Sequence, residues 1–310
     1  LCRGYGVSIG FVTLSLSYLI TSFKFSNSRH LWFALIFSCF ASYANFTSLI
    51  FWASVCLFVL LYYVINRKGE NPLSNGKFAL MILLGLGYAV LILNPILKMQ
   101  NDDQFRFWTS NGFAEETVKS LVHNGVYGSR IFLTVNFISY FCMIIFALHL
   151  IILAAKFIKS NEKLADLRKP EYSVTLILLL TIVINILQTV ILKTPNLNGR
   201  TALLYYPLFI ATLLTMRTHF NVIHATWIKL TISIIISFFG IHHLFHTATP
   251  KKVREWSYDA HTIDALNIMK KHSSNESISI CTHWLFNPSF YYHTIKDKQV
   301  KLVPYSEEIN

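Results

Sequence analysis

Long apolar stretches alternate with short polar ones along most of this 310-residue chain. A helix that crosses a bilayer needs roughly 20 mainly apolar residues. Residues 31–65 carry no charge and exceed one span, so Asn45, Thr47 and Ser48 are expected to separate two helices there. The pattern thus predicts an all-α polytopic membrane protein with about eight transmembrane helices, at 6–22, 31–44, 47–65, 78–97, 131–157, 174–192, 201–216 and 227–246.

The pattern changes after His246, where residues 247–310 become polar enough to form a soluble tail. Apolar residues at helical spacing predict a helix at 261–272, and a second helix is expected at 288–294. Alternating apolar residues predict strands at 277–281 and 300–303. We therefore expect a membrane domain at 1–246 and a small α/β module at 247–310 that is truncated at its end.

Composition supports the membrane assignment. The chain is 54% hydrophobic and only 14% charged, against about 25% charged residues in ordinary soluble domains. Its net charge of +12 lies mostly in short loops, where basic residues set topology and meet anionic lipid, so we do not expect nucleic-acid binding. No two of the five cysteines are closely spaced, which argues against a zinc site, an iron–sulfur cluster or a disulfide framework.

The distribution of basic residues predicts the orientation in the membrane. Loops 23–30, 66–77, 156–172 and 217–226 hold eleven Lys and Arg residues, whereas loops 98–130 and 193–200 hold six. By the positive-inside rule the first set is cytoplasmic. The second set and the tail then lie on the outer side.

The longest inter-helix loop, 98–130, contains two pairs of adjacent carboxylates. These residues are Asp102, Asp103, Glu115 and Glu116. A general base needs a carboxylate near its substrate, which makes all four candidates, although adjacent loop carboxylates are more commonly solvated charge. Residues 114–123 are predicted to form an amphipathic helix lying on the membrane.

The stretch 196–209 places Arg200 at the start of an apolar helix that carries Tyr205 and Tyr206 in its first turns. A guanidinium offers a planar fork of donors suited to phosphate, and a helix start adds unpaired N–H groups. The stretch therefore suits an anion at the membrane surface. The alternative is an interfacial anchor, since Arg and Tyr gather at both lipid–water boundaries.

Other chemistry is poorly represented in the sequence. No apolar segment contains Asp, Glu or an internal Lys, which argues against an ion-coupled pump. Phosphate-binding loops of ATPases, HExxH and GxSxG motifs are absent. His242 and His246 share a helix face and could bind a metal or a phosphate, but without a nearby carboxylate or Cys, interfacial packing is the favoured interpretation.

Four stretches together resemble the bacterial membrane glycosyltransferases of the C-type (GT-C) fold. They are RGYGVS at 3–8, YANFTSL at 43–49, GFAEETVKSLV at 112–122 and GRTALLYYPLF at 199–209. The tail, from WSYDAHT to CTHWLFNPSFYY, resembles the extracytoplasmic module that often follows in that family. The chain is most similar to the polyprenyl-phosphate-sugar-dependent group of Bacteroidetes-type bacteria, which is related to protein mannosyltransferases and lipid A aminoarabinose transferases.

The resemblance implies a sugar on a polyprenyl phosphate as donor, and a glycan, lipid or protein as acceptor. Transfer would occur at the outer face of the bacterial cytoplasmic membrane. Arg200, with Tyr205 or Tyr206, corresponds to the place where that family holds the donor phosphate. The candidates for the acceptor side or the pocket are Arg3, Asn45, Glu115 and Glu116.

The family's catalytic base is an Asp in the first external loop, between the first two helices. This chain begins at what resembles the start of the second helix, so we expect that Asp upstream of Leu1. No residue here is assigned as the base, and the chain is expected to be an N-terminally truncated fragment that is inactive by itself. A divalent metal assists some members, but no metal ligand is predicted here.

Two further interpretations stay open. A transporter or flippase of lipid-linked sugars would need a continuous polar path across the bilayer, which the uncharged apolar segments disfavour. A non-enzymatic membrane scaffold would use the tail to bind a partner. An apolar groove leading to a cavity beside Arg200 would favour the transferase.

Overall fold

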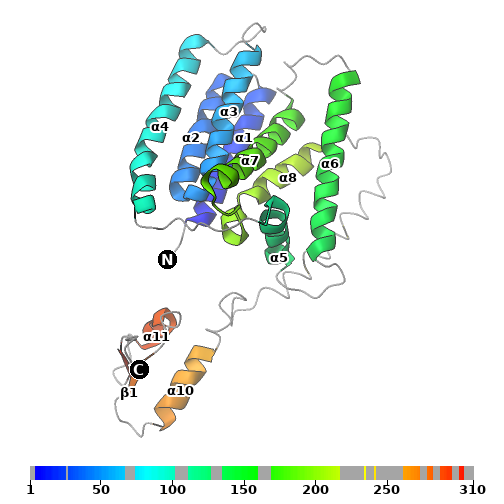
Figure 1. The fold of residues 1–310 in the computed structure, drawn as a ribbon. Helices are drawn as coiled ribbons and strands as arrows, with labels where there is room; N and C mark the ends of the chain where they lie inside the picture. The colour runs from blue at the N-terminus through cyan, green and yellow to red at the C-terminus, as the bar shows by residue number, and fades with distance from the viewer. Residues whose placement is uncertain are drawn as a thin grey trace. The chain divides into compact units, whose positions relative to one another are not determined.

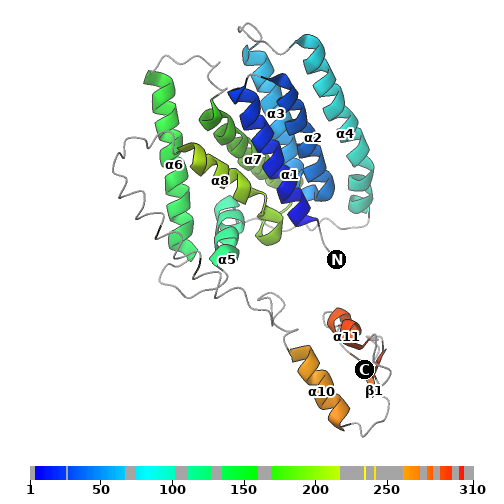
Figure 2. The same ribbon diagram turned by 180° about the vertical axis from the view of Figure 1, so that it is seen from behind.

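The chain forms two compact units, residues 1–230 and 231–310. The computed structural model describes residues 4–25, 27–66, 74–101, 111–126, 135–159, 169–216, 234, 241, 261–272, 278–281, 287–294 and 300–303. In the larger unit, α4 and α6 stand at opposite edges, with α1, α2, α3 and α7 between them (Figures 1 and 2).

The first half of the larger unit is four helices in sequence order. They are α1 (Tyr5–Lys24), α2 (Ser28–Ala44), α3 (Leu49–Asn66) and α4 (Asn75–Asn101). The side chain of Asn27 caps α2 by accepting a hydrogen bond from the Arg29 N–H at 3.0 Å, which satisfies one of the donors left open at a helix start.

The expected break within 31–65 is confirmed. α2 ends at Ala44, and the short 3₁₀ turn η1 (Phe46–Ser48) leads into α3. The side-chain oxygen of Asn45 accepts from the backbone N–H and the hydroxyl of Thr47, both at 3.1 Å. Asn45 is in an extended conformation, so the chain changes direction here instead of continuing one long helix.

The second half contains α6 (Val135–Lys159), α7 (Pro170–Leu192) and α8 (Tyr205–Met216). Pro170 is the first residue of α7, where its missing N–H costs nothing. α8 crosses obliquely between α7 and α6 (Figures 1 and 2). The expectation that this last helix starts at residue 201 is wrong, because Gly199–Ala202 form the 3₁₀ turn η4 and α8 begins at Tyr205.

Five of the described helices are long and apolar enough to cross a membrane: Tyr5–Phe23, Phe46–Ile65, Asn75–Lys98, Val135–Lys156 and Pro170–Leu192. Of the other expected spans, α2 has 17 residues and α8 has 12, and most of 227–246 lies outside the described residues. The chain is a helical multi-pass membrane protein.

Hydroxyl groups connect the helices in the interior of the larger unit. Ser15 of α1 donates to the Ala34 carbonyl of α2 at 2.7 Å, and Thr181 of α7 donates to the Ser54 hydroxyl of α3 at 3.0 Å. All three hydroxyl side chains are buried. Small polar residues allow helices to approach closely where hydrophobic burial gives little drive for association.

Contacts between loops show which connections share an end of the bundle. The Lys77 ammonium at the start of α4 donates to the Ser28 hydroxyl at the start of α2, at 3.1 Å. The loops at 23–30 and 66–77, both expected on the cytoplasmic side, therefore meet at one end.

The smaller unit contains α10 (Thr262–His272), β1 (Ile278–Cys281), α11 (Asn287–Thr294) and β2 (Val300–Val303). The two strands are parallel, with Ile278 opposite Val300. Leu266, Ile280, Phe290 and Val300 form its described core. These elements match the helices and strands expected from the pattern, while the placement of the tail outside the membrane stays a prediction.

Candidate functional site

A polar contact joins two segments of the larger unit that lie 80 residues apart in sequence. The first, 111–126, contains the π-helical turn η2 (Ala114–Lys119) and α5 (Ser120–Val126). The second is the connection between α7 and α8. The Glu116 carboxylate joins them: Oε2 accepts from the backbone N–H and side-chain amide of Asn196 at 2.8 and 3.0 Å, and Oε1 accepts from the Asn111 N–H at 2.8 Å.

Two hydroxyls extend this contact along the connection. The Thr117 hydroxyl donates to the Leu197 carbonyl at 2.6 Å, and the Ser120 hydroxyl accepts from the Gly199 N–H at 2.9 Å. Gly199 has a φ of 49°, a conformation that glycine adopts without steric cost. The connection is thus held at three points immediately before Arg200.

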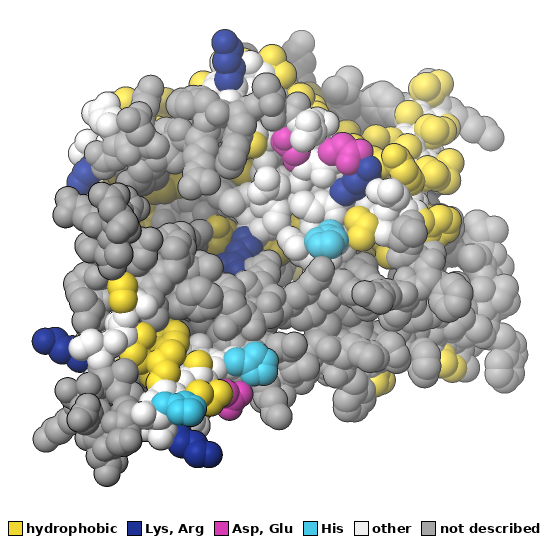
Figure 3. Space-filling model, turned by 60° about the horizontal axis from the view of Figure 1, so that its bottom comes forward, with side chains coloured by type: hydrophobic (Ala, Val, Ile, Leu, Met, Phe, Trp, Pro, Cys, Tyr) yellow, Lys and Arg dark blue, Asp and Glu magenta, His cyan; other side chains and the backbone are white. Residues whose placement is uncertain are grey.

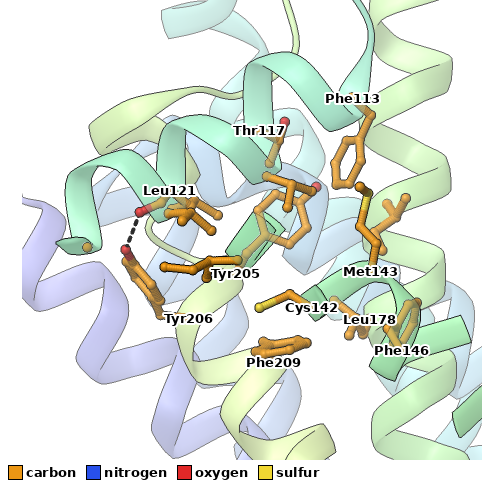
Figure 4. A pocket seen from close by; sticks show the side chains of 15 residues that line it. Phe113, Thr117, Leu121, Cys142, Met143, Phe146, Leu178, Tyr205, Tyr206 and Phe209 are labelled. Carbon is orange, nitrogen blue, oxygen red and sulfur yellow. Dashed lines mark hydrogen bonds between the residues drawn. The ribbon is translucent and has the colours of Figure 1, made fainter. Parts of the chain in front are cut away.

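The segment 111–126 also forms one wall of a cavity of about 340 Å³. The other walls come from α6, α7 and α8, as the side chains of Met143, Leu178 and Phe209 in Figure 4 illustrate. The lining is almost entirely apolar, and none of the described residues that line it is charged. Its size is at the lower end of the range for ligand pockets, and its surface suits an apolar molecule.

Tyr205 and Tyr206 both line this cavity with their rings. Tyr205 is buried, packs edge-on against Phe113 with ring centroids 5.6 Å apart, and directs its hydroxyl to the Thr181 carbonyl at 3.4 Å. The Tyr206 hydroxyl donates to the Leu121 carbonyl at 2.8 Å (Figure 4). Either phenol would have to give up this bond in order to donate to a phosphate.

The helix predicted at 114–123 is present, although its first half is a π turn. Its apolar side chains Val118, Leu121 and Val122 face the cavity. The segment therefore packs on the protein through its apolar side, and its contact with a membrane surface stays a prediction.

The two neighbouring carboxylates of this segment have different surroundings. Glu115 is exposed and pairs with Lys119 one turn later, and this hydrogen bond raises the pKa of Lys119. Acidic and basic side chains adjoin on the face shown in Figure 3. The charge of Glu115 is thus balanced at the surface, whereas Glu116 lies in the contact between segments.

Comparisons with protein-family models, with curated proteins and with solved structures find no match to this chain.

The structure brings some of the predicted site residues together. Arg200 is exposed on η4, directly after the connection that Glu116 holds, and Tyr205 and Tyr206 begin α8 beside the cavity. Asn45 instead caps η1 between α2 and α3, and it is not among the residues that line this cavity.

Other candidates lie outside the described residues: Arg3, Asp102, Asp103, His242 and His246. Within the part of the chain that is described, no three His, Cys, Asp or Glu side chains form a group that could hold a metal ion. A divalent metal, which assists some members of the family that the chain resembles, stays a possibility for this chain.

Several residues of the site are not marked by any motif in the sequence. Thr117, Ser120 and Asn196 match no motif, although the two hydroxyls follow Glu116 at i+1 and i+4. The apolar wall from α6, which includes Cys142 and Phe146, resembles any lipid-facing helix in sequence. Only the fold distinguishes cavity-lining from lipid-facing residues there.

Proposed function

We propose that this chain binds the donor of a membrane glycosyltransferase of the GT-C type. The donor is a sugar on a polyprenyl phosphate, and the acceptor is a glycan, lipid or protein at the outer face of a bacterial cytoplasmic membrane. The observation that carries the proposal is the apolar cavity whose walls adjoin the connection bearing Arg200.

The cavity supports an apolar ligand. Its lining of aliphatic, aromatic and sulfur-containing side chains has no charged member among the described residues. Lipid tails already keep water from an apolar chain in the membrane, so such a surface would hold the chain by close van der Waals packing. A segment of a polyprenyl chain matches this chemistry.

Arg200 supports an anionic group on the same ligand. It is exposed on η4 and precedes the start of α8 by five residues. The guanidinium can form two parallel hydrogen bonds with phosphate oxygens, and the N-terminal end of α8 adds the positive end of its helix dipole. An apolar chain and a phosphate would thus be bound by neighbouring parts of one site.

The remaining parts of the proposal rest on the family resemblance. It includes eight spans, among them the short helices α2 and α8, with the tail on the extracytoplasmic side. Glu115 and Asn45 stay candidates for the acceptor side, and no residue is assigned as the catalytic base. A flippase of lipid-linked sugars is less favoured, because the cavity surface is apolar and a polar head group would gain no hydrogen bonds in crossing it.

The test of the proposal is binding of polyprenyl phosphate by the Arg200→Ala variant in lipid nanodiscs. Loss of the charge-assisted contact is expected to weaken affinity about ten- to a hundredfold. Lys193→Asn is the matched control, since it removes a cation from the same connection at a position whose φ of 52° Asn tolerates. Unchanged affinity in Arg200→Ala, in a folded protein, would refute the role of Arg200.

A further inference from the structure

Glu115 and Glu116 are adjacent carboxylates with opposite roles in the fold. Glu115 is exposed and bonded only one turn away, to Lys119, among its described contacts. Glu116 is half-buried and bonds to Asn196, 80 residues away in sequence. Substitutions at these two positions therefore remove the same charge from the same turn with different structural consequences.

The oxygens of Glu116 are already engaged as acceptors. Oε2 takes two N–H groups from Asn196, which occupies both lone pairs of that oxygen. Oε1 takes the N–H of Asn111. A general base must instead direct a lone pair at the proton that it removes, so this arrangement suits a structural anchor better than a base.

The bonds of Glu116 control where the α7–α8 connection lies. Asn196 is the first residue that the segment 111–126 holds, and the bonds of Leu197 to Thr117 and of Gly199 to Ser120 follow. Gly199 directly precedes Arg200 in the chain. Without the Glu116 anchor, the connection loses its two-bond attachment to segment 111–126 and keeps two single bonds to that segment. The Thr189 hydroxyl of α7 would still donate to the Asn196 side chain at 3.1 Å.

We propose that Glu116 is a positioning residue for the phosphate site: by holding Asn196 it fixes the turn that presents Arg200. This rests on the proposed function, in which Arg200 binds the donor phosphate. Because the same segment supplies cavity wall residues from Phe113 to Gly125, Glu116 also fixes the phosphate site relative to the apolar cavity. The apolar and anionic parts of one ligand are thereby held at a constant separation.

The experiment compares Glu116→Ala, Glu116→Gln and the control Glu115→Ala in the full chain in nanodiscs. Two quantities are measured: hydrogen exchange of the Asn196 and Gly199 amides without ligand, and affinity for polyprenyl phosphate. In Glu116→Ala we expect faster exchange at both amides and affinity about ten- to a hundredfold weaker. Glu116→Gln is expected to be intermediate, because one acceptor oxygen remains, and Glu115→Ala is expected to match the unmodified chain.

The outcomes separate the two proposals. Unchanged exchange in folded Glu116→Ala, or in Glu116→Gln when the Ala variant does not fold, overturns the positioning role. The positioning role is also overturned if Glu116→Ala shows faster exchange but unchanged affinity while Arg200→Ala does weaken binding. If exchange is faster in Glu116→Ala but Arg200→Ala leaves the affinity unchanged, the proposed function is overturned and the anchor role of Glu116 is supported. A base role instead predicts unchanged exchange and unchanged affinity in both folded Glu116 variants.

Discussion

At the scale of single residues, the contact between α5 and α8 depends on one missing side chain. A Cβ at Gly125 would lie 2.9 Å from the Tyr206 hydroxyl oxygen, the atom that donates to the Leu121 carbonyl. The ring carbon bearing that hydroxyl would be 3.9 Å away, which is an ordinary contact. Gly125 therefore makes room for one oxygen atom and the hydrogen bond that it forms.

We predict that Gly125→Ala is costly only while that oxygen is present. In the unmodified chain the added methyl displaces the hydroxyl and weakens its bond to Leu121, whereas in a Tyr206→Phe background the methyl meets no close atom. The free energy of unfolding should therefore show a coupling of about 1 kcal/mol between the two substitutions. A double-mutant cycle in detergent measures it, and additive effects would contradict the proposed contact.

At the scale of elements, α1 and α2 are held at close approach by small residues. Ser8 of α1 donates to the Ala41 carbonyl at 2.8 Å, one turn from the place where Gly4 meets the end of α2. Gly4 has a φ of 69°, and a Cβ there would lie 2.2 Å from the Ala44 carbonyl oxygen. That neighbour is backbone, so it cannot move aside as a flexible side chain would.

Gly4→Ala is accordingly predicted to destabilise the pair of helices by about 2–4 kcal/mol, from the left-handed conformation together with the steric overlap. Gly10→Ala in the same helix is the control, because nothing lies within 4 Å of the added methyl and Ala favours a helix over Gly. Thermal unfolding of the two variants in one detergent provides the comparison. Equal midpoints would mean that the α1–α2 contact is looser than described.

At the scale of the whole molecule, the sequence predicts those features that are determined by composition over the length of one helix. Five of the expected spans, the break at Asn45 and the elements of the tail follow from periodicity and local polar residues, which act over a few positions. The bond from Glu116 to Asn196 depends on how two distant segments meet, and no local pattern encodes that. The directions of the Tyr205 and Tyr206 hydroxyls depend on tertiary packing in the same way.

The start of α8 shows why local rules can mislead. Apolar residues from 201 onward favoured a helix there, but the Asn198 N–H donates to the Thr201 hydroxyl at 2.9 Å, and that hydroxyl donates to the Asn198 carbonyl at 2.7 Å. These short-range bonds stabilise the 3₁₀ turn in preference to another α-helical turn. A hydrophobicity pattern does not register this competition.

The loop contacts give a prediction for membrane topology. Bonds join 111–126 to 196–199, and another joins Lys77 to Ser28, so each pair of loops must share a side of the membrane. With cysteine-free background chains, Glu115→Cys should react with a membrane-impermeant maleimide in intact cells, whereas Asn75→Cys should react only after permeabilisation. The basic residues favour this assignment. The opposite labelling pattern would invert the proposed orientation, and equal labelling in detergent is the control.

The π turn at Ala114–Lys119 makes this segment tolerant of losing one residue. A π turn accommodates one residue more than an α turn, so removing a single residue would let the segment revert to a regular α-helix. Because the extra residue is taken up within the turn, the residues before and after it would keep their orientation. A chain lacking Val118 or Lys119 could then still direct Glu116 and Ser120 toward Asn196 and Gly199. Homologous chains that keep this site are therefore expected to include some that are one residue shorter here.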